Sequence, residues 1–426
     1  MFKILRIHTR IGMLSYMDVS AEELRTRLRQ FAEAMNRRKP DWETAVCASA
    51  VNQYYLTGTM QDGAAFIRRD PSAPGGCRLL YGVRRSFDRA GWESPLFRDG
   101  GYDGETLLPM VSYRDIAERL GGDLGALYAE GDTLSLTALD RLKKYFSFTG
   151  PGFFDSVIAE VRSVKSEAEI ALMRRSGEAH RVLLEERVPG LLREGITEAE
   201  FMGELLAEMY RSGYQGVTRF HQNIGGMCVG QIGFGTNSLY PSLFNGPGGA
   251  KGYGPAAPLS GDRDRKLARG DIVFVDIGFG AGGYHSDKTQ VYAFGADPPA
   301  EFVSAHRFCM DFQKRLAERL VPGAVPSGLY REMTSSLSEN ELSRFMGVDS
   351  RHRAAFLGHG IGLYIDEFPV IAKGFDDPLE ENMTLALEPK KSVPGIGMAG
   401  VEDTYIVKPG GGVCITGGGR DIIRIG

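Results

Sequence analysis

The chain has 426 residues, of which 42% are hydrophobic and 24% are charged, close to the averages of soluble globular proteins. This composition excludes wholesale disorder, and the length allows roughly two or three domains. The net charge of −4, from 50 basic and 54 acidic residues, gives no basic excess for binding nucleic acid or an anionic membrane.

The sequence also argues against export and membrane insertion. No apolar run reaches the about 18 residues that a spanning helix needs, and Arg6, His8 and Arg10 interrupt the N-terminal apolar stretch that a signal peptide would require. The five cysteines are scattered without CxxC spacing, which disfavours a disulfide framework or a thiolate zinc site. We therefore expect a cytoplasmic protein without a membrane or nucleic-acid partner.

Residues 1–152 alternate between helical and strand patterns. Ser20 and Glu23 form a capping box that predicts a helix. Apolar runs at 44–50, 64–67 and 78–83 predict strands, and helical spacing returns at 113–120 and 136–146. This pattern predicts an α/β domain. We interpret the segment 148–152 as a linker, because its Gly-Pro-Gly can continue neither a helix nor a central strand.

Residues 153–426 mix helices with hairpins and predict an α+β domain. Two capping boxes, Ser166 with Glu169 and Thr197 with Glu200, start the first two helices. Further helices fit 300–320 and 327–345. Strand-like patterns occupy much of 215–295 and 383–423.

Two predicted hairpins each carry a pair of acids. Asp276 and Asp287 lie in apolar strands on either side of a glycine turn. A turn centred near residues 280–281 would place them nearly opposite each other, where like charges destabilise a sheet. Glu388 and Glu402 repeat the pattern around a loop rich in proline and glycine. One such pair could be edge-strand acids facing water. Two pairs in one domain favour a shared cation, since buried carboxylates need compensation.

A histidine lies between the two hairpins in the sequence. His359 is flanked by Gly358 and Gly360, which let the backbone approach closely and leave the ring unobstructed. A lone histidine can also be structural. Four carboxylates and one imidazole suit Mn²⁺, Co²⁺, Fe²⁺ or Zn²⁺, and their four negative charges balance two divalent ions.

The order Asp276, Asp287, His359, Glu388, Glu402 resembles the metal-ligand signature of the pita-bread metallopeptidases, such as prolidase, Xaa-Pro aminopeptidase and methionine aminopeptidase, on a fold shared with the non-metal creatinase. The matching stretches are VDIGFGAGGYHSDKTQVY, GHGIGLYIDEFP, LALEPKKSVPGIG and GVEDTYIV. EVRSVKSEAEIALMRRSGEAH resembles the entry to that catalytic domain, and VNQYYLTG resembles the creatinase/prolidase N-terminal domain.

The resemblance implies a creatinase/prolidase-like N-terminal domain at 1–152 and a pita-bread (creatinase/aminopeptidase-like) catalytic domain at 153–426. It implies a homodimeric hydrolase that cleaves short peptides before proline with two divalent ions, Mn²⁺ first and Co²⁺, Zn²⁺ or Fe²⁺ as alternatives. A hydroxide bridging the ions would attack the carbonyl carbon. Glu388 would hold the water and carry a proton to the leaving nitrogen.

Three positions depart from the pattern of this family. Ser242 and Asp366 stand where accessory histidines are usual, and Gly400 stands where an arginine is common. Asp366 is a candidate catalytic residue, because it could exchange a hydrogen bond or bind a substrate amine, although it could also be a solvated acid. Ser242 could line the substrate site or only make room there.

Two further histidines are open to alternative interpretations. His221 is a candidate substrate-binding residue that could supply an imidazole, or it could be a surface or core histidine. His285 shares the predicted strand face of Asp287, so it could neighbour the metals or face solvent.

The departures leave other functions open. Because the accessory histidines are replaced while all ligands are retained, a metal-dependent C–N hydrolase or lyase acting on a non-peptide small molecule is the main alternative. A binding protein on the same scaffold would have no metal. The retained ligands argue against a metal-free creatinase mechanism.

Overall fold

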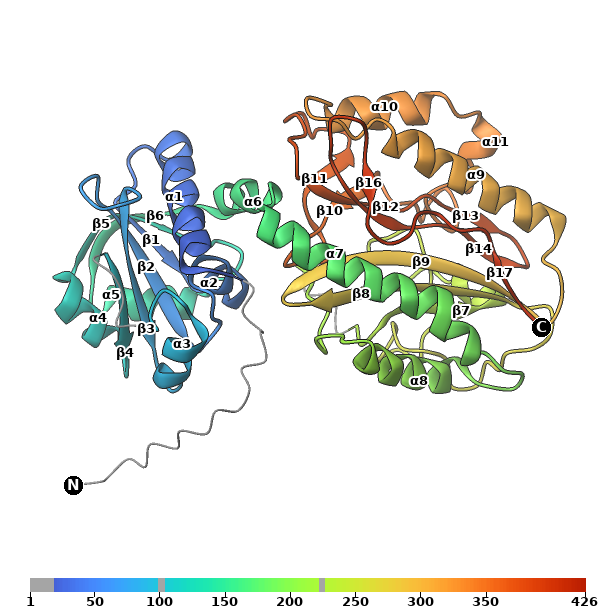
Figure 1. Cartoon of the computed structure of the whole chain (residues 1–426), viewed down its shortest axis with the longest axis horizontal. Coiled ribbons are helices and arrows are strands. Elements are labelled where there is room, and N and C mark those ends of the chain that lie inside the picture. Colours follow the sequence, from blue (N-terminus) through green and yellow to red (C-terminus); the bar gives the residue numbers. More distant parts are fainter. Residues whose placement is uncertain (1–18, 99–103, 222–226) are drawn as a thin grey trace, which may run out of the picture. The chain divides into compact units, whose positions relative to one another are not determined.

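The computed structural model describes residues 19–98, 104–221 and 227–426 and divides the chain into two compact units, Met1–Val161 and Arg162–Gly426 (Figure 1). The N-terminal stretch that argued against a signal peptide lies outside the described residues. Among the described residues, none of the helices combines the length and the apolarity that crossing a membrane requires.

The first unit is built on a six-stranded mixed sheet in the order β4-β3-β2-β1-β5-β6. Its strands are β1 Thr44–Cys47, β2 Gly63–Arg69, β3 Cys77–Val83, β4 Glu105–Pro109, β5 Asp123–Ala129 and β6 Ser147–Phe153. Its helices are α1 Ala21–Arg38, α2 Ala50–Thr57, α3 Phe87–Glu93, α4 Tyr113–Leu120 and α5 Leu136–Lys143, and α6 Asp155–Ser163 spans the division between the units. Predicted strands and helices are therefore present in the expected α/β order.

The interpretation of 148–152 as a linker is wrong. These residues belong to β6, which pairs in parallel with β5 at one edge of the sheet. Pro151 lacks an N–H, and an edge strand tolerates this because one of its sides forms no ladder. The contact-based division of the chain lies later, after Val161.

The second unit contains a four-stranded and a five-stranded sheet, in the orders β17-β9-β8-β7 and β11-β10-β12-β15-β16, and a separate hairpin. The first sheet comprises β7 Gly230–Phe234, β8 Ile272–Ala281, β9 Tyr284–Phe294 and β17 Ile423–Ile425. The second comprises β10 Phe356–Gly360, β11 Glu367–Ala372, β12 Thr384–Leu387, β15 Asp403–Ile406 and β16 Val413–Cys414. The hairpin is β13 Lys390–Val393 with β14 Gly397–Gly400.

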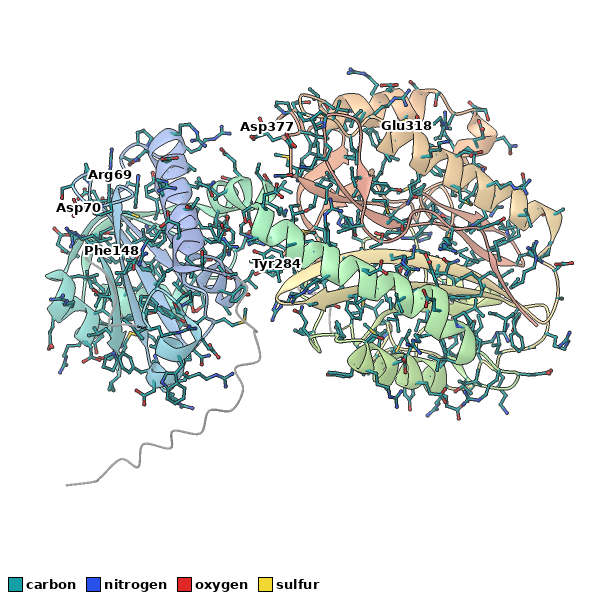
Figure 2. The ribbon with its side chains drawn as sticks, in the orientation of Figure 1. Arg69, Asp70, Phe148, Tyr284, Glu318 and Asp377 are labelled. Atoms are coloured by element: carbon teal, nitrogen blue, oxygen red, sulfur yellow. The ribbon has the colours of Figure 1, made fainter. Side chains whose placement is uncertain are left out.

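Helices cover these sheets. They are α7 Glu167–Val182, α8 Glu198–Arg211, α9 Ala300–Ala317, α10 Pro326–Ser335 and α11 Glu339–Leu342. Helix α7 packs along β8 and β9, α8 packs on β7, and α9 packs on β13 and β14 (Figure 1). Figure 2 labels Tyr284 beside α7, where its hydroxyl donates a 2.5 Å hydrogen bond to Glu169. A buried apolar core between α8 and β7–β9 includes Phe201, Phe234 and Phe279.

The capping boxes at Ser166 and Thr197 are confirmed as the starts of α7 and α8. The single helix expected at 327–345 is wrong, because α10 ends at Ser335 and the capping box of Ser338 with Glu341 begins the separate α11. The cap satisfies backbone N–H groups at a new helix start, which interrupts the first helix.

Candidate metal centre

The first acid pair lies on the antiparallel strands β8 and β9. Asp276 is opposite Thr289 and Asp287 is opposite Gly278, because Ala281 pairs with Tyr284 across a turn at residues 282–283. The turn is therefore two residues later than expected. The two acids are diagonal neighbours on one face, where the separation of about 7–8 Å exceeds that of a direct pair.

The second pair lies where the hairpin of β12 and β15 passes into that of β13 and β14. Leu387 pairs with Asp403 and Lys390 pairs with Gly400, so Glu388 and Glu402 lie between these two paired steps. An isolated bridge joins Thr289 on β9 to Glu402, and the Thr289 hydroxyl lies 3.3 Å from Glu402 Oε2. This bridge connects the two sheets and brings the second acid pair to the first.

His359 reaches the acids from β10, opposite Ala386 on β12. Its Nδ1 is 3.0 Å from the Gly360 carbonyl oxygen. Its Nε2 lies 3.4 Å from Glu388 Oε1 and 3.8 Å from Glu402 Oε1. A hydrogen bond at one ring nitrogen orients the other, as in histidines that bind metals.

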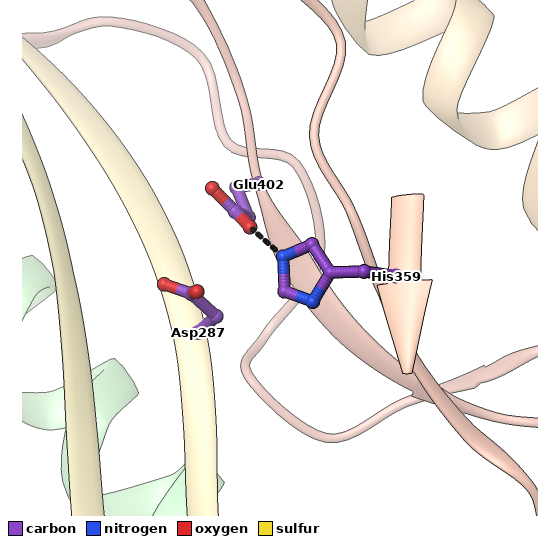
Figure 3. A group of neighbouring side chains, drawn as sticks. All are labelled: Asp287, His359 and Glu402. Carbon is purple, nitrogen blue, oxygen red and sulfur yellow. Dashed lines mark ion pairs between the residues drawn. The ribbon is translucent and has the colours of Figure 1, made fainter. Parts of the chain in front are cut away.

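Asp287, His359 and Glu402 form a group that could hold a metal ion, because one ligand atom from each lies within 4.8 Å of the others (Figure 3). Glu402 Oε1 is buried and has no hydrogen-bond partner among the described residues. Two carboxylates and an imidazole suit a divalent transition ion. Asp287 and His359 are half-buried, while Glu402 is 2% exposed.

A fully buried lysine, which the sequence interpretation missed, lies among the acids. The Lys390 ammonium is 3.0 Å from Asp276 Oδ2, 3.1 Å from Glu388 Oε2 and 2.6 Å from Glu402 Oε2. Its place in the sequence, two residues after Glu388, could have indicated this position, because alternate residues of an extended chain share a face.

The charges of the group perturb one another. Burial raises the pKa of Asp287 to about 8, and the negative charge of Asp276 is the second cause of the increase. Burial also raises the pKa of Glu402, again with help from neighbouring acids. For His359, burial would lower the pKa, but the Glu388 and Asp287 carboxylates outweigh it and raise that pKa to about 9. The metal-free group therefore retains protons that a divalent ion would displace.

Two of the predicted substrate-binding and catalytic residues are linked to each other. The backbone N–H of His221 donates a 2.8 Å hydrogen bond to Asp366 Oδ1, and the His221 ring packs edge-on against Tyr364 at 5.4 Å. Burial raises the pKa of Asp366 although the nearby His359 charge opposes it. Asp366 directly precedes β11, whose partner strand β10 carries His359.

The hydrogen bonds of the other predicted positions go to groups other than these acids. The Ser242 hydroxyl accepts a 3.3 Å hydrogen bond from the Phe244 N–H, within its own loop. His285 is fully buried, with Nδ1 3.0 Å from the Gly362 carbonyl oxygen and Nε2 3.2 Å from the Arg219 nitrogen. Burial lowers the pKa of His285 to about 4. This histidine therefore joins backbone segments and does not face solvent.

Comparison with known proteins agrees with this geometry. Residues 171–409 match the sequence model of metallopeptidase family M24. The chain is 31% identical over 277 residues to the probable dipeptidase PepE of Mycobacterium tuberculosis, covering 65% of this chain and 64% of that protein. It is 24% identical over 403 residues to the Xaa-Pro dipeptidase of Pyrococcus furiosus, covering 94% and 100%. The crystal structure of dipeptidase PepE from Mycobacterium ulcerans superposes with a TM-score of 0.72 at 23% identity, covering 94% of this chain and 98% of that one.

The match over more than half of the chain shows the family: this protein belongs to metallopeptidase family M24. The resemblance to the pita-bread metallopeptidases is thereby confirmed, and the structural likeness confirms the expected fold class. Members of this family depend on a dinuclear metal centre. The chain spans less than two thirds of the length of the curated PepE relatives that it matches.

Proposed function

We propose that this chain is a metal-dependent peptidase that hydrolyses short peptides at the bond before proline. The observation that carries the proposal is the convergence of Asp287, His359 and Glu402 within 4.8 Å of one another inside a family M24 domain. The relative named Xaa-Pro dipeptidase aligns over its whole length and over 94% of this chain, which supports proline-directed cleavage.

The chain's residues have distinct roles in this proposal. Asp287, His359 and Glu402 would hold a divalent ion, which would polarise the scissile carbonyl and lower the pKa of a water molecule. Glu388 would accept a proton and pass it to the leaving nitrogen; its Oε1 lies 3.4 Å from His359 Nε2 and its Oε2 lies 3.1 Å from Lys390 Nζ. The Lys390 contact keeps the Glu388 carboxyl ionised by lowering its pKa against the effect of burial.

Asp366 would bind the amino group of the peptide or donate a hydrogen bond to it. Its fixed contact with the His221 backbone and its place beside the strand of His359 support this role. His221 would then act in substrate binding through its backbone and its packing on Tyr364. Ser242 would line the site without contacting the acids.

Finer properties follow as parts of the same proposal. We propose Mn²⁺ as the ion, since oxygen-rich donor sets with one imidazole suit it, with Co²⁺, Zn²⁺ and Fe²⁺ as alternatives. We propose a homodimer in the cytoplasm; all five cysteines are free thiols, which fits a reducing compartment.

A second candidate is a metal-dependent hydrolase or lyase acting on a C–N or related bond of a non-peptide molecule. The presence of Asp366 where an imidazole is expected favours it, because a carboxyl recognises a cationic group that a neutral ring would not. A positively charged small substrate would fit this candidate.

The proposal is tested by supplying the metal-free chain with Mn²⁺ and assaying Xaa-Pro dipeptides, Xaa-Pro-Yaa tripeptides and matched Xaa-Ala peptides. We expect release of the N-terminal residue from the proline peptides and little from the alanine controls. Cleavage of dipeptides alone would indicate a dipeptidase, and cleavage of tripeptides an aminopeptidase. Absence of cleavage with bound Mn²⁺ confirmed would contradict peptidase function and favour the non-peptide candidate.

A further inference from the structure

We propose that the ammonium group of Lys390 takes the place of one divalent ion, so that this chain holds a single divalent ion, at Asp287, His359 and Glu402. This inference rests on the proposed metal-dependent function and changes the number of ions in it. The contacts of the lysine already satisfy its ammonium group. An ammonium has three donors and no acceptor, and Lys390 faces three carboxylate oxygens at 3.0, 3.1 and 2.6 Å.

The two oxygens of each glutamate face different neighbours. Glu388 and Glu402 each direct Oε2 toward Lys390 and Oε1 toward His359 Nε2. The acids therefore have two cation-facing sides. On one side the ammonium occupies the space between Asp276, Glu388 and Glu402. On the other side Glu402 Oε1 is buried without a hydrogen-bond partner among the described residues, and His359 Nε2 lies 3.8 Å from it, so an oxygen and an imidazole nitrogen are available there to bind an ion.

The backbone beside Lys390 leaves room for its side chain. Gly400 is directly opposite Lys390 in the β13–β14 hairpin. A Cβ atom on Gly400 would lie 2.8 Å from Lys390 Cγ and 2.6 Å from the Pro389 carbonyl oxygen, closer than real contacts allow. The glycine at this position, where an arginine is expected from the family pattern, thus leaves the volume that the buried lysine stem fills.

Exposure separates the two sides further. Lys390 is fully buried, whereas Asp287 and His359 are half-buried. A catalytic ion needs a coordination position open to water or substrate. Asp287 and His359 retain the partial exposure that such a position requires, whereas Lys390 retains none.

Charge balance is compatible with one ion but does not decide the number. Four carboxylates with Lys390 and one divalent ion leave one negative charge, and a second divalent ion would leave one positive charge. The position of Lys390 determines the number of ions, because a second ion would need the oxygens that Lys390 already contacts. A second ion bound to the same oxygens would lie close to the Lys390 ammonium, and the two positive charges would repel each other strongly in a buried site.

The number of ions is measured by loading the full chain with Mn²⁺, removing unbound ion and determining manganese per chain by mass spectrometry, with electron paramagnetic resonance as a second readout. We expect one ion in the wild type with the spectrum of an uncoupled Mn²⁺. In Lys390→Met, which keeps the stem and removes the charge, we expect a second ion and a spin-coupled spectrum.

The matched control is Lys391→Met. Lys391 is the next residue of β13, but its Nζ donates to the Glu341 carbonyl oxygen and lies over the Phe308 ring, away from the acids. We expect this variant to retain one ion per chain.

Two ions in the wild type would overturn the inference and leave the proposed function intact, and this result does not depend on whether the variant folds. A folded Lys390→Met protein that still binds one ion would also overturn it. No bound ion in the wild type would refute the proposed metal-dependent function together with this inference. None of these outcomes depends on peptidase activity. A failure to cleave peptides is therefore distinguishable from a wrong number of bound ions.

Discussion

Glu388 lies between a permanent cation and an imidazole. Its two oxygens are 3.1 Å from Lys390 Nζ and 3.4 Å from His359 Nε2. Both contacts fix the carboxyl in one orientation, and the lysine favours its ionised form. The carboxylate is therefore held ionised and in one orientation, and in the proposed mechanism it would release readily any proton that it accepts.

Replacing Glu388 by Gln removes the proton acceptor while keeping the size of the side chain. We expect kcat on the best peptide substrate to fall by roughly 10²–10⁴-fold, the range typical for loss of a general acid or base. Metal content is measured on the same sample, so that loss of the ion is not mistaken for loss of proton transfer. Glu381→Gln, an exposed glutamate that pairs with Lys408, serves as the control. Wild-type kcat in a metal-loaded Glu388→Gln variant would contradict the role.

The stability of the metal-free protein should decrease as the pH rises. The pKa of His359 is raised from 6.5 to about 9, and that of Asp287 from 3.8 to about 8. At a pH between the unfolded and the folded pKa of either group, the folded state binds more protons than the unfolded state. The free energy of unfolding therefore decreases as the pH rises. The contribution is complete below the unfolded pKa of each group and is lost as the pH passes its folded pKa.

Metal binding has the opposite pH dependence, because the ion must displace these protons. We expect the increase in Tm on adding Mn²⁺ to be larger at pH 8.5 than at pH 6.5. Differential scanning calorimetry with and without the ion measures both effects, and His359→Gln should weaken them. A Tm increase that is constant or larger at the lower pH would show that His359 and Asp287 do not change protonation on binding.

At the scale of elements, the strand β10 holds His359 by close approach to both neighbouring strands. A Cβ atom on Gly358 would lie 2.3 Å from the Ala386 carbonyl oxygen, and one on Gly360 would lie 2.2 Å from that of Phe368. The glycines flanking His359 therefore serve sheet packing, in addition to leaving the ring unobstructed as expected from the sequence.

Gly360→Ala should consequently separate β10 from β11 and displace His359. We expect the free energy of unfolding to fall by about 1–3 kcal/mol, as in other overpacked sites, and Mn²⁺ affinity to fall with it. Urea denaturation and isothermal titration measure the two quantities. In the control Gly203→Ala, the added Cβ meets nothing within 4 Å in α8, and stability should rise by up to about 1 kcal/mol. Equal behaviour of the two variants would contradict the close-approach explanation.

The sequence predicts element types and the acid-bearing hairpins well, because apolar periodicity and capping boxes are local signals. It places the β8–β9 turn two residues early, since several glycines near residue 280 can each adopt a turn conformation. It also mistakes β6 for a linker, because whether Pro151 lies in an edge strand or a loop depends on distant strands. Strand alternation could have placed Lys390 on the same face as Glu388. Its contacts with Asp276 and Glu402 depend on tertiary structure and could not be predicted.

At the scale of the whole second unit, the candidate centre exists because two sheets meet. Asp276 and Asp287 come from the sheet of β8 and β9, and His359 comes from the sheet of β10 and β12. The bridge between Thr289 and Glu402 joins these sheets at the acids. Neither sheet alone brings together the donors that a divalent ion requires.

We expect these donors to bind one ion. Anomalous diffraction from crystals of the Mn²⁺-loaded full chain both counts and locates the bound ions. We predict a manganese peak within bonding distance of Asp287, His359 and Glu402, with the Lys390 ammonium still between Asp276 and Glu402. Two manganese peaks among these residues would contradict the single-ion site, and an ordered centre with no manganese peak at these three residues would contradict metal binding there.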